Sequence, residues 1–157
     1  MSVILVRHAQ ALADADDAVR ALSPAGKEAA ERLARWLVRS GAKSPVEIRH
    51  STLVRARQTA EHIGRAWNTP LVETPSLGPL DDVTGVARAL MSETRDVVIV
   101  GHLPHLSRLA AALLVGDPRV EMIELPTTCA LLMERVPASG ARWWIRWVIT
   151  PELIRDA

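Results

Sequence analysis

Unbroken apolar runs mark two segments of the chain as strands that are buried on both faces. Residues 3–6 read Val-Ile-Leu-Val, and the strongest run, Asp-Val-Val-Ile-Val-Gly, covers residues 96–101. Apolar runs without polar alternation are typical of parallel strands that are covered by helices on both sides. Shorter apolar segments at residues 46–50 and 71–73 indicate two further strands. The pattern therefore predicts a mainly parallel sheet.

Between these strands, apolar residues recur with the period of an α-helix. Residues 23–41 carry a full set of helix signals, with Ser23 as the N-cap, Pro24 in the first turn and Gly41 at the end. The expected apolar stripe of this helix consists of Ala29, Leu33, Trp36 and Leu37. We expect this stripe to face the sheet.

Three further helices are expected at residues 51–67, 83–93 and 103–116, and Ser51 or Thr52 is the expected N-cap of the first of these. Strands that alternate with helices are typical of α/β proteins. The prediction is a three-layer α/β sandwich, with a mostly parallel central sheet and helices on both of its faces.

The pattern changes near the end of the chain. Residues 127–136 and 141–150 resemble two strands around an Ala-Ser-Gly turn, which predicts an antiparallel edge. Strict alternation in the second of these places one set of side chains on a buried face and the other set on the opposite face. The expected sets are Trp143, Ile145 and Trp147 against Arg142, Trp144 and Arg146. We expect one domain over residues 1–157.

Composition and charge exclude several classes of function. The chain holds 19 Lys and Arg against 18 Asp and Glu, so it has no bulk attraction for nucleic acid or for a membrane. Cys129 is the only cysteine, which excludes a disulfide framework and a cysteine-based zinc site. The longest apolar run, residues 109–115, is far too short to span a bilayer, and no targeting signal is visible. We expect a cytoplasmic protein.

Basic and imidazole side chains follow three of the predicted strands. The first strand leads into Arg7 and His8, the second into His50 and Ser51 with Arg55 one helical turn later, and a third into His102. Sites in open α/β sheets form at the carboxyl ends of the strands. Arginine matches phosphate oxygens bidentately, and a helix N-terminus adds backbone N–H groups. The conjunction predicts a cationic pocket for a phosphoryl group.

Each of these features also has an ordinary explanation on its own. Arg7 and His8 can form a solvated strand end, and Arg55 can be a surface charge on its helix. His102 and His105, with His50, could suggest a zinc site, but no acidic or cysteine ligand accompanies them. Three matching strand ends favour the phosphoryl pocket over these readings.

Three segments resemble the signatures of the histidine phosphatase (phosphoglycerate mutase-like) superfamily. "LVRHA" is similar to its R-H-G signature, "STLVRARQTAE" to its S-P-x-x-R-A-x-Q-T-A segment, and "VIVGHLPHLSRLA" to its strand and helix around the second histidine. The short length, "VRALSPAGKEAAERLARWL", "GHLP" and the closing "ITPELI" resemble the SixA-type phosphohistidine phosphatases. Two residues depart from the pattern: Ala9 replaces the usual glycine and Thr52 the usual proline.

The resemblance implies roles for the predicted pocket residues. His8 is the implied nucleophile, and we expect its second ring nitrogen to donate to a backbone carbonyl. Arg7, Arg55 and His102 are the implied ligands of the phosphoryl oxygens. Arg20, in the similar "VR-x-L" segment, is an additional implied phosphate ligand. No metal or other cofactor is needed, because the arginines supply the positive charge.

Many relatives use a carboxylate to protonate the leaving oxygen, and the corresponding loop here is "LGPLDDV". Asp81 or Asp82 could serve, and nothing in the sequence chooses between them. The alternative reading is a polar loop and a helix cap. A phosphohistidine substrate has less need of an acid, because its P–N bond breaks readily.

These observations predict hydrolysis of phosphohistidine on a partner protein through a phospho-His8 intermediate. The stretches after His8 and at residues 74–82 are short, so an uncovered pocket could admit a histidine that projects from another protein. The implied partners are a histidine-kinase phosphotransfer domain or a sugar-transport phosphocarrier. The alternatives are a small-molecule phosphomonoesterase of the same fold and a non-catalytic phosphate-binding module.

Overall fold

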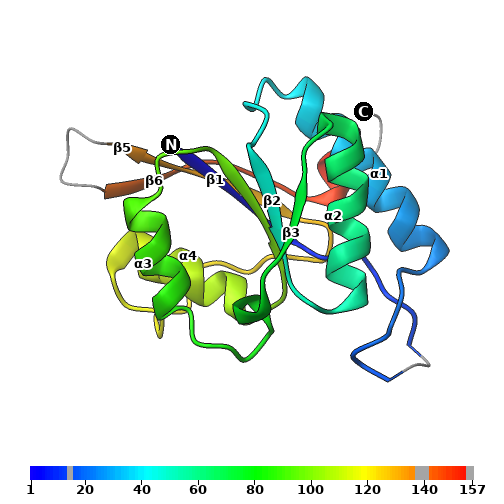
Figure 1. The fold of residues 1–157 in the computed structure, drawn as a ribbon, viewed down its shortest axis with the longest axis horizontal. Helices are drawn as coiled ribbons and strands as arrows, with labels where there is room; N and C mark the ends of the chain where they lie inside the picture. Colours follow the sequence, from blue (N-terminus) through cyan, green and yellow to red (C-terminus); the bar gives the residue numbers. More distant parts are fainter. Residues whose placement is uncertain (14–15, 137–141, 155–157) are drawn as a thin grey trace.

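Six strands form one mixed sheet in the computed structural model, which describes residues 1–13, 16–136 and 142–154 (Figure 1). The strands are β1 (Ser2–Arg7), β2 (Glu47–His50), β3 (Leu71–Glu73), β4 (Val97–Gly101), β5 (Ala130–Val136) and β6 (Arg142–Ile149). Their order across the sheet is β3-β2-β4-β1-β5-β6. The first four strands run parallel, and β5 is antiparallel to both β1 and β6. The predicted parallel sheet with an antiparallel edge is confirmed.

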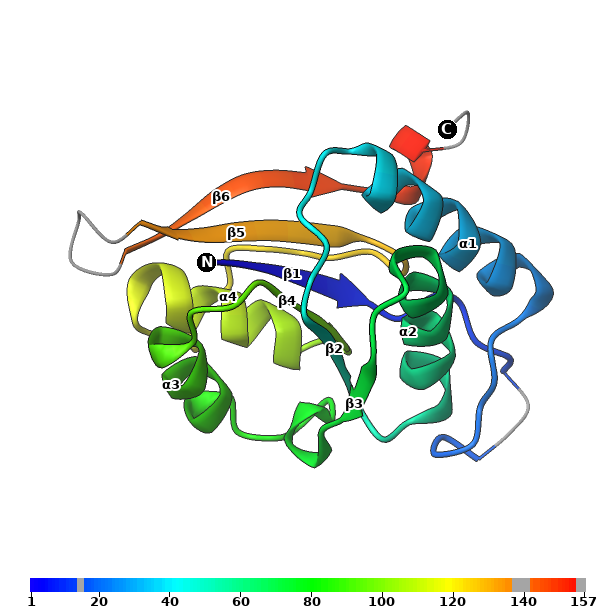
Figure 2. The ribbon, with the colours of Figure 1, turned by 45° about the horizontal axis from the view of Figure 1, so that its top comes forward.

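Four α-helices cover the two faces of this sheet (Figure 2). α1 (Pro24–Arg39) and α2 (Val54–Trp67) pack together on one face, and α3 (Thr84–Ser92) and α4 (His105–Val115) pack together on the other. Two short 3-10 turns, η1 (Pro75–Leu77) and η3 (Pro151–Ile154), complete the described elements. The predicted three-layer α/β sandwich is confirmed.

β1 is held by hydrophobic packing on both of its faces. Val3 and Leu5 belong to the core cluster that contains Leu106 of α4, whereas Ile4 and Val6 belong to the cluster on the side of α1. Each of these four side chains is almost completely buried. Full burial of such a side chain stabilises a fold by about 1.5–3 kcal/mol. This two-sided packing fixes the position of the carboxyl end of β1.

Backbone hydrogen bonds fix the residues at this end of the strand. The Arg7 amide donates to the Cys129 carbonyl and the His8 amide to the Gly101 carbonyl, each over 3.0 Å. Arg7 is level with Gly101 in the parallel pairing of β1 with β4. The two strands therefore bring His8 and His102, which follow them, side by side.

α1 begins as the sequence predicts. The Ser23 hydroxyl accepts from the Gly26 amide over 3.0 Å, which is the expected N-cap hydrogen bond. Gly41 lies just after the helix with a positive φ of 77°. Leu33 and Leu37 are buried as expected, but Ala30 and Ala34 accompany them instead of Ala29 and Trp36, which are only half-buried.

The predicted N-cap of α2 is wrong. The helix begins at Val54, three residues later than expected, and its N-cap residue Leu53 makes no side-chain capping bond. The Ser51 amide still donates to the carbonyl of Val100, and its hydroxyl lies 2.8 Å from a ring nitrogen of His102. Ser51 thus completes the strand pairing and contacts the candidate site, and its hydroxyl accepts from the amide of Leu53, which precedes the first residue of the helix.

A β-bulge overturns the predicted alternation of β6. The pairing with β5 shifts between Leu132 and Met133, so one extra β6 residue is inserted near Arg146. Trp143 consequently packs in the cluster on the side of α4, and Trp147 packs on the opposite side against Trp36, with ring centroids 5.1 Å apart. The predicted Ala-Ser-Gly turn lies outside the described residues.

Gly26 is the point where α1 approaches the segment after β1 most closely. A Cβ atom at this position would lie 2.0 Å from the backbone carbonyl oxygen of Gln10. Gly→Ala inside a helix normally stabilises by about 1 kcal/mol, but this contact is a backbone clash, so we expect Gly26→Ala to destabilise by roughly 1–3 kcal/mol. Urea unfolding measures the difference. Gly85→Ala in α3 is the matched control because a Cβ there meets open space, and equal stability changes in the two variants would contradict the prediction.

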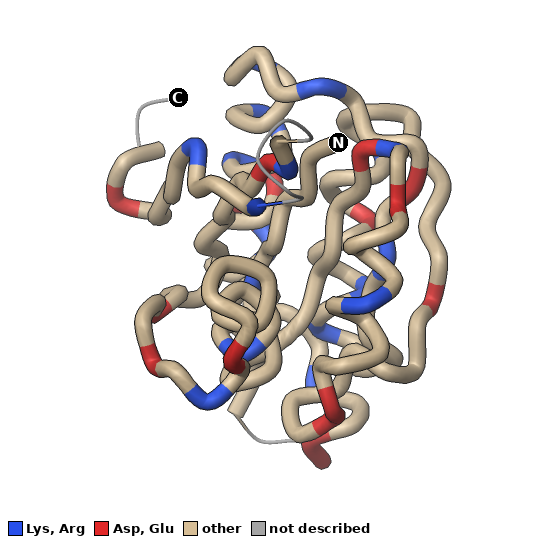
Figure 3. The backbone as a smooth tube through the Cα atoms, turned by 90° about the vertical axis from the view of Figure 1, so that its left-hand side faces the viewer, with Lys and Arg blue, Asp and Glu red and all other residues tan. Residues whose placement is uncertain are grey.

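None of the helices within residues 1–13, 16–136 and 142–154 is long and apolar enough to cross a membrane. Figure 3 shows the positions of Lys and Arg interspersed with those of Asp and Glu along the backbone, in keeping with the near-zero net charge.

Candidate active site

His8 lies at the carboxyl end of β1 with its two ring nitrogens in different surroundings. Nδ1 donates to the Ala9 carbonyl oxygen over 2.8 Å, as expected from the sequence. Because Nδ1 carries the proton, Nε2 is the unprotonated ring nitrogen, and it accepts from Nε of Arg55 over 3.4 Å. The geometry therefore presents an unprotonated imidazole nitrogen beside a guanidinium group.

Burial and neighbouring positive charge keep the His8 ring neutral. Burial is the largest cause, and the guanidinium groups of Arg55, Arg7 and Arg20 act in the same direction, so the pKa of His8 falls from 6.5 to about 4. The hydrogen bond to Ala9 opposes the shift only in part. A neutral imidazole at physiological pH is the form that can attack phosphorus.

Arg55 is buried in the first turn of α2, with only 4% of its surface exposed. Its Nη1 donates to the Asp17 backbone carbonyl over 2.6 Å, and its Nη2 lies 3.2 Å from the Asp17 carboxylate. A buried guanidinium needs such partners, because an unpaired buried charge is costly. These contacts hold the fork of Arg55 toward His8.

Arg7 reaches the same region from the end of β1. Its Nη1 donates to the Leu125 carbonyl over 2.8 Å, whereas its buried Nε has no hydrogen-bond partner among the described residues. Burial lowers the pKa of Arg7 from its usual value. Arginine nevertheless stays charged in proteins. Arg7 thus has donor capacity left for an anion.

His102 faces His8 with ring centroids 4.9 Å apart and the rings tilted by 49°. Its Nε2 lies 2.8 Å from the Ser51 hydroxyl, which orients the ring, and its buried Nδ1 has no hydrogen-bond partner among the described residues. Burial first, and then the charges of the facing groups His8 and Arg55, lower the pKa of His102 to about 3. His102 is therefore a second neutral imidazole in the site.

Asp17 is a residue of this site that the sequence interpretation missed. Besides its contacts with Arg55, its carboxylate accepts from Nη2 of Arg20 over 2.6 Å. These hydrogen bonds, with that of Arg20 first, hold the pKa of Asp17 below its usual range, so the group is an anion and not a proton donor. The i,i+3 spacing from Arg20 was the only sequence signal. Arg20 is brought to the site through this carboxylate, and its own side chain is 30% exposed.

The two aspartates considered as general acids both have structural partners. Asp81 accepts from the Gly78 amide over 2.7 Å, and Asp82 accepts from the amide and the hydroxyl of Thr84 at the start of α3. The Thr84 amide and hydroxyl lower the pKa of Asp82. Within the described part of the chain, neither carboxylate is hydrogen-bonded to His8, so their geometry favours the loop and cap reading.

Among the described residues, neither His50 nor His105 is hydrogen-bonded to His8, Arg55 or His102. His50 Nδ1 donates to the Ser51 carbonyl over 2.9 Å, and His105 is completely buried at the start of α4. No group of three or more His, Cys, Asp or Glu side chains in the described residues could hold a metal ion. Cys129 is buried, and burial raises the pKa of its thiol to about 11, so it is a packing residue rather than a nucleophile.

The lowered pKa values of His8 and His102 predict that the fold loses stability on mild acidification. In the folded protein these groups take up protons only near pH 4 and 3, whereas in the unfolded chain they do so near pH 6.5. The stability that depends on these two neutral rings is therefore fully present above pH 6.5, and it is lost as the pH falls toward 4. Thermal unfolding followed by circular dichroism should show a lower Tm at pH 5 than at pH 7.

Two controls separate this effect from the titration of carboxylates. Imidazole resonances in an NMR titration, assigned with His8→Gln, should place the midpoint of His8 near pH 4. The decline in Tm should be smaller in His8→Gln and His102→Gln than in the unaltered protein. A His8 midpoint near 6.5 would contradict the buried, arginine-flanked position of this ring.

Comparison with known proteins gives one family match. The sequence model of the histidine phosphatase superfamily (branch 1) matches residues 3–81, which is half of the chain and includes Arg7, His8 and Arg55. No curated protein matches the sequence. The family match agrees with the resemblance seen in the motifs.

Solved structures with the same fold cover almost the whole chain. The protein histidine phosphatase SixA complexed with tungstate is 26% identical, with a TM-score of 0.84 over 96% of this chain and 97% of that one. A candidate phosphohistidine phosphatase SixA from Agrobacterium tumefaciens is 25% identical, with a TM-score of 0.78 over 96% and 97%. The α-ribazole phosphatase of Shigella flexneri is 17% identical, with a TM-score of 0.77 over 96% and 97%, and shows the fold alone.

Proposed function

The chain belongs to the histidine phosphatase superfamily, branch 1, and on that basis we propose that it hydrolyses phosphohistidine on a partner protein. The observation that carries the proposal is the pair of His8 and Arg55. His8 Nε2 is unprotonated and lies 3.4 Å from a buried guanidinium, which is the arrangement that a phosphoryl group needs on arrival. Such a pair of side chains suits a phosphatase of this superfamily.

In the proposed mechanism, His8 Nε2 attacks phosphorus and forms a new P–N bond. The P–N bond of the substrate breaks, and its imidazole leaves with a proton taken up from solvent. Water then attacks phospho-His8, and inorganic phosphate leaves while His8 regains its neutral form. Arg7, Arg55 and His102 hold the phosphoryl oxygens in both steps, and Arg20 assists at the open side of the pocket.

Phosphohistidine is favoured over a phosphate monoester by the state of the carboxylates. Asp17 is an anion between two arginines. The Asp81 carboxylate accepts from the Gly78 amide, and the Asp82 carboxylate accepts from the Thr84 amide at the start of α3. A site without a protonated carboxyl group suits a substrate whose leaving group is a weak base. The α-ribazole phosphatase shares the fold of this chain, so small-molecule phosphatase activity is the second candidate.

The deciding experiment compares two classes of substrate. Purified protein is incubated with a histidine-kinase phosphotransfer domain and with a sugar-transport phosphocarrier, each phosphorylated on histidine, and with a series of sugar phosphates. We expect kcat/KM to be far higher on the phosphoproteins. Preferred turnover of the sugar phosphates would favour the second candidate. Binding without turnover of any substrate would favour a non-catalytic phosphate-binding module.

We expect hydrolysis to be independent of metal ions. Three guanidinium groups, from Arg7, Arg55 and Arg20, surround His8 closely enough to lower its pKa, and they supply positive charge toward the phosphoryl oxygens. Activity should therefore survive an excess of chelator. Loss of activity on chelation, followed by recovery on addition of Zn²⁺ or Mg²⁺, would contradict this description of the pocket.

A further inference from the structure

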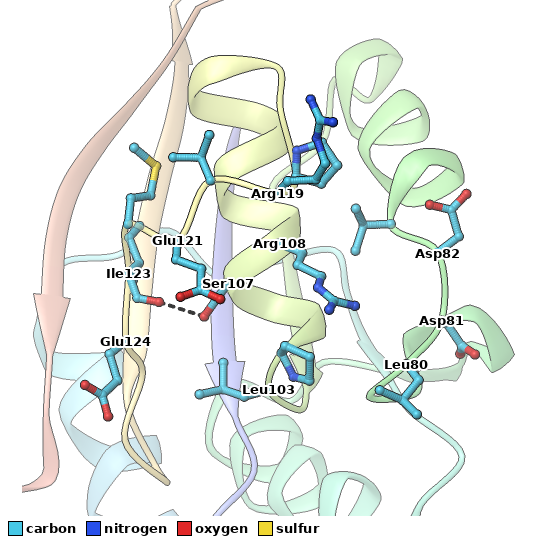
Figure 4. A pocket seen from close by; sticks show the side chains of 15 residues that line it. Leu80, Asp81, Asp82, Leu103, Ser107, Arg108, Arg119, Glu121, Ile123 and Glu124 are labelled. Atoms are coloured by element: carbon cyan, nitrogen blue, oxygen red, sulfur yellow. Dashed lines mark hydrogen bonds between the residues drawn. The ribbon is translucent and has the colours of Figure 1, made fainter.

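A groove of about 890 Å³ lies over α4, between the loop at residues 80–83 and the extended segment at residues 118–124 (Figure 4). Arg108 of α4 projects toward the wall that carries Asp81 and Asp82, while Glu121 and Glu124 lie on the other wall. The Ser107 hydroxyl donates to the Ile123 carbonyl over 2.7 Å and ties the extended segment to the helix. The groove therefore has a defined shape.

One end of the groove opens beside the phosphoryl pocket. Leu103, which lines the groove, directly follows His102 in the chain. Glu124, on the opposite wall, directly precedes Leu125, whose carbonyl accepts from Arg7. This end of the groove is therefore lined by residues that are next in sequence to His102 and to the residue that binds Arg7.

The walls of the groove expose large apolar side chains. Leu80 is 80% exposed, and Val120 and Met122 are each more than 40% exposed. Exposed apolar side chains that gather around one groove are typical of an interaction surface, whereas scattered ones are ordinary. Their position at the groove indicates a partner that has apolar surface of its own.

The charge of the groove is opposite to that of the pocket. Four carboxylates line it, those of Asp81, Asp82, Glu121 and Glu124, against two guanidinium groups. One of these guanidinium groups, Arg119, is already paired with Asp117 over 2.9 Å. A cationic phosphoryl pocket thus stands next to a groove with excess negative charge. This pattern disfavours small substrates that carry further anionic groups and favours basic surface beside the phosphoryl group.

We propose that this groove docks the partner protein, by contact with an apolar and basic surface that flanks its phosphohistidine. The proposal rests on the function proposed above and adds the surface that selects the partner. The phosphohistidine enters the pocket at His8, an apolar side chain of the partner contacts Leu80 and Met122, and Lys or Arg side chains approach Glu121 and Glu124. Free phosphohistidine reaches only the pocket.

The test compares Leu80→Asp with the unaltered protein on two substrates, a phosphorylated histidine-kinase phosphotransfer domain and free phosphohistidine. Loss of an apolar contact at the interface should lower kcat/KM on the phosphoprotein by about tenfold through KM, with the rate on free phosphohistidine changed less than about twofold. Leu153→Asp is the matched control, because Leu153 is 70% exposed and lies on η3, against α1 on the other face of the sheet.

A charge variant tests the second half of the proposal. Glu121→Lys should lower kcat/KM on the phosphoprotein at low salt, and the difference should shrink as salt is added, since rim charges act mainly on association. Glu28→Lys on α1 is its control. Unchanged phosphoprotein kinetics in both Leu80→Asp and Glu121→Lys, with an active unaltered protein, would overturn the docking proposal alone. An unaltered protein that hydrolyses free phosphohistidine or sugar phosphates but no phosphoprotein would overturn the proposed function and the docking surface together.

Discussion

His8→Ala is expected to lower the turnover of phosphohistidine by roughly 10⁴-fold or more, since removal of a nucleophile abolishes the covalent route. The structure gives the reason in terms of position. His8 Nε2 is unprotonated because Nδ1 donates to Ala9, and the pKa of about 4 keeps the ring neutral. Alanine offers no atom that could form the P–N bond.

The measurement is kcat on a phosphorylated phosphotransfer domain, together with rapid acid-free quenching to detect phosphate bound to the enzyme. When the substrate carries a radioactive phosphoryl group, the radioactivity should appear on the unaltered protein and be absent from His8→Ala. His62→Ala, which removes an imidazole from the outer part of α2, is the matched control and should keep both activity and label. More than a few per cent of residual turnover in a folded His8→Ala protein would refute the assignment of the nucleophile.

Arg7→Ala and Arg55→Ala should each reduce kcat/KM by roughly 10²–10³-fold, which corresponds to about 2.7–4 kcal/mol for the loss of one preorganised donor to the reacting group. Arg55 is held toward His8 by Asp17, and Arg7 is held by the carbonyl of Leu125. Both guanidinium groups are therefore aligned before the substrate arrives. Arg20→Ala should reduce the stabilisation of the reacting group by less, about 1–2 kcal/mol in kcat/KM, because the Arg20 side chain is partly exposed to water.

Two further variants test whether the effect of Arg55 on kcat/KM depends on the shape of its guanidinium group or only on its charge. Arg55→Lys keeps the positive charge but loses the planar guanidinium group, so its kcat/KM should remain well below that of the unaltered protein. Arg57→Ala removes an exposed arginine of the same helix, which pairs with Glu61, and should have little effect. If Arg20→Ala proves the most damaging substitution, the phosphoryl group is centred on the loop and not at the strand ends. A harmless Arg55→Ala would mean that Arg55 does not hold the phosphoryl group, although it lies beside His8.

The sequence allowed the elements and the central constellation to be predicted because both depend on local patterns. Buried parallel strands are apolar along their whole length, and a three-layer fold brings their carboxyl ends to one edge. Arg7, His8, Arg55 and His102 each lie at a strand end or one helical turn beyond it, so their convergence could be expected. The roles of these residues remain predictions until the variants are measured.

The features that were missed depend on tertiary contacts. Asp17 lies in a polar loop, and no local pattern indicates that its carboxylate reaches Arg55, 38 residues further along the chain. Ser51 is a residue type that often caps helices, but its hydroxyl contacts His102 and the Leu53 amide, and the helix begins only at Val54. The bulge near Arg146 is set by the pairing with β5, which the alternation of β6 alone cannot show.

The place of β1 in the centre of the sheet has a consequence for how the protein acquires its activity during synthesis. β1 is the first strand made, but its two neighbours are residues 97–101 and 130–136. The amides of Arg7 and His8 find their acceptors only on Cys129 and Gly101. Closing such long loops is slow, whereas the backbone hydrogen bonds within α1 and within α2 join residues that are close in the chain. A nascent chain can therefore gain helix early, but the carboxyl end of β1, with Arg7 and His8, is fixed only after β4 and the segment that leads into β5 have docked.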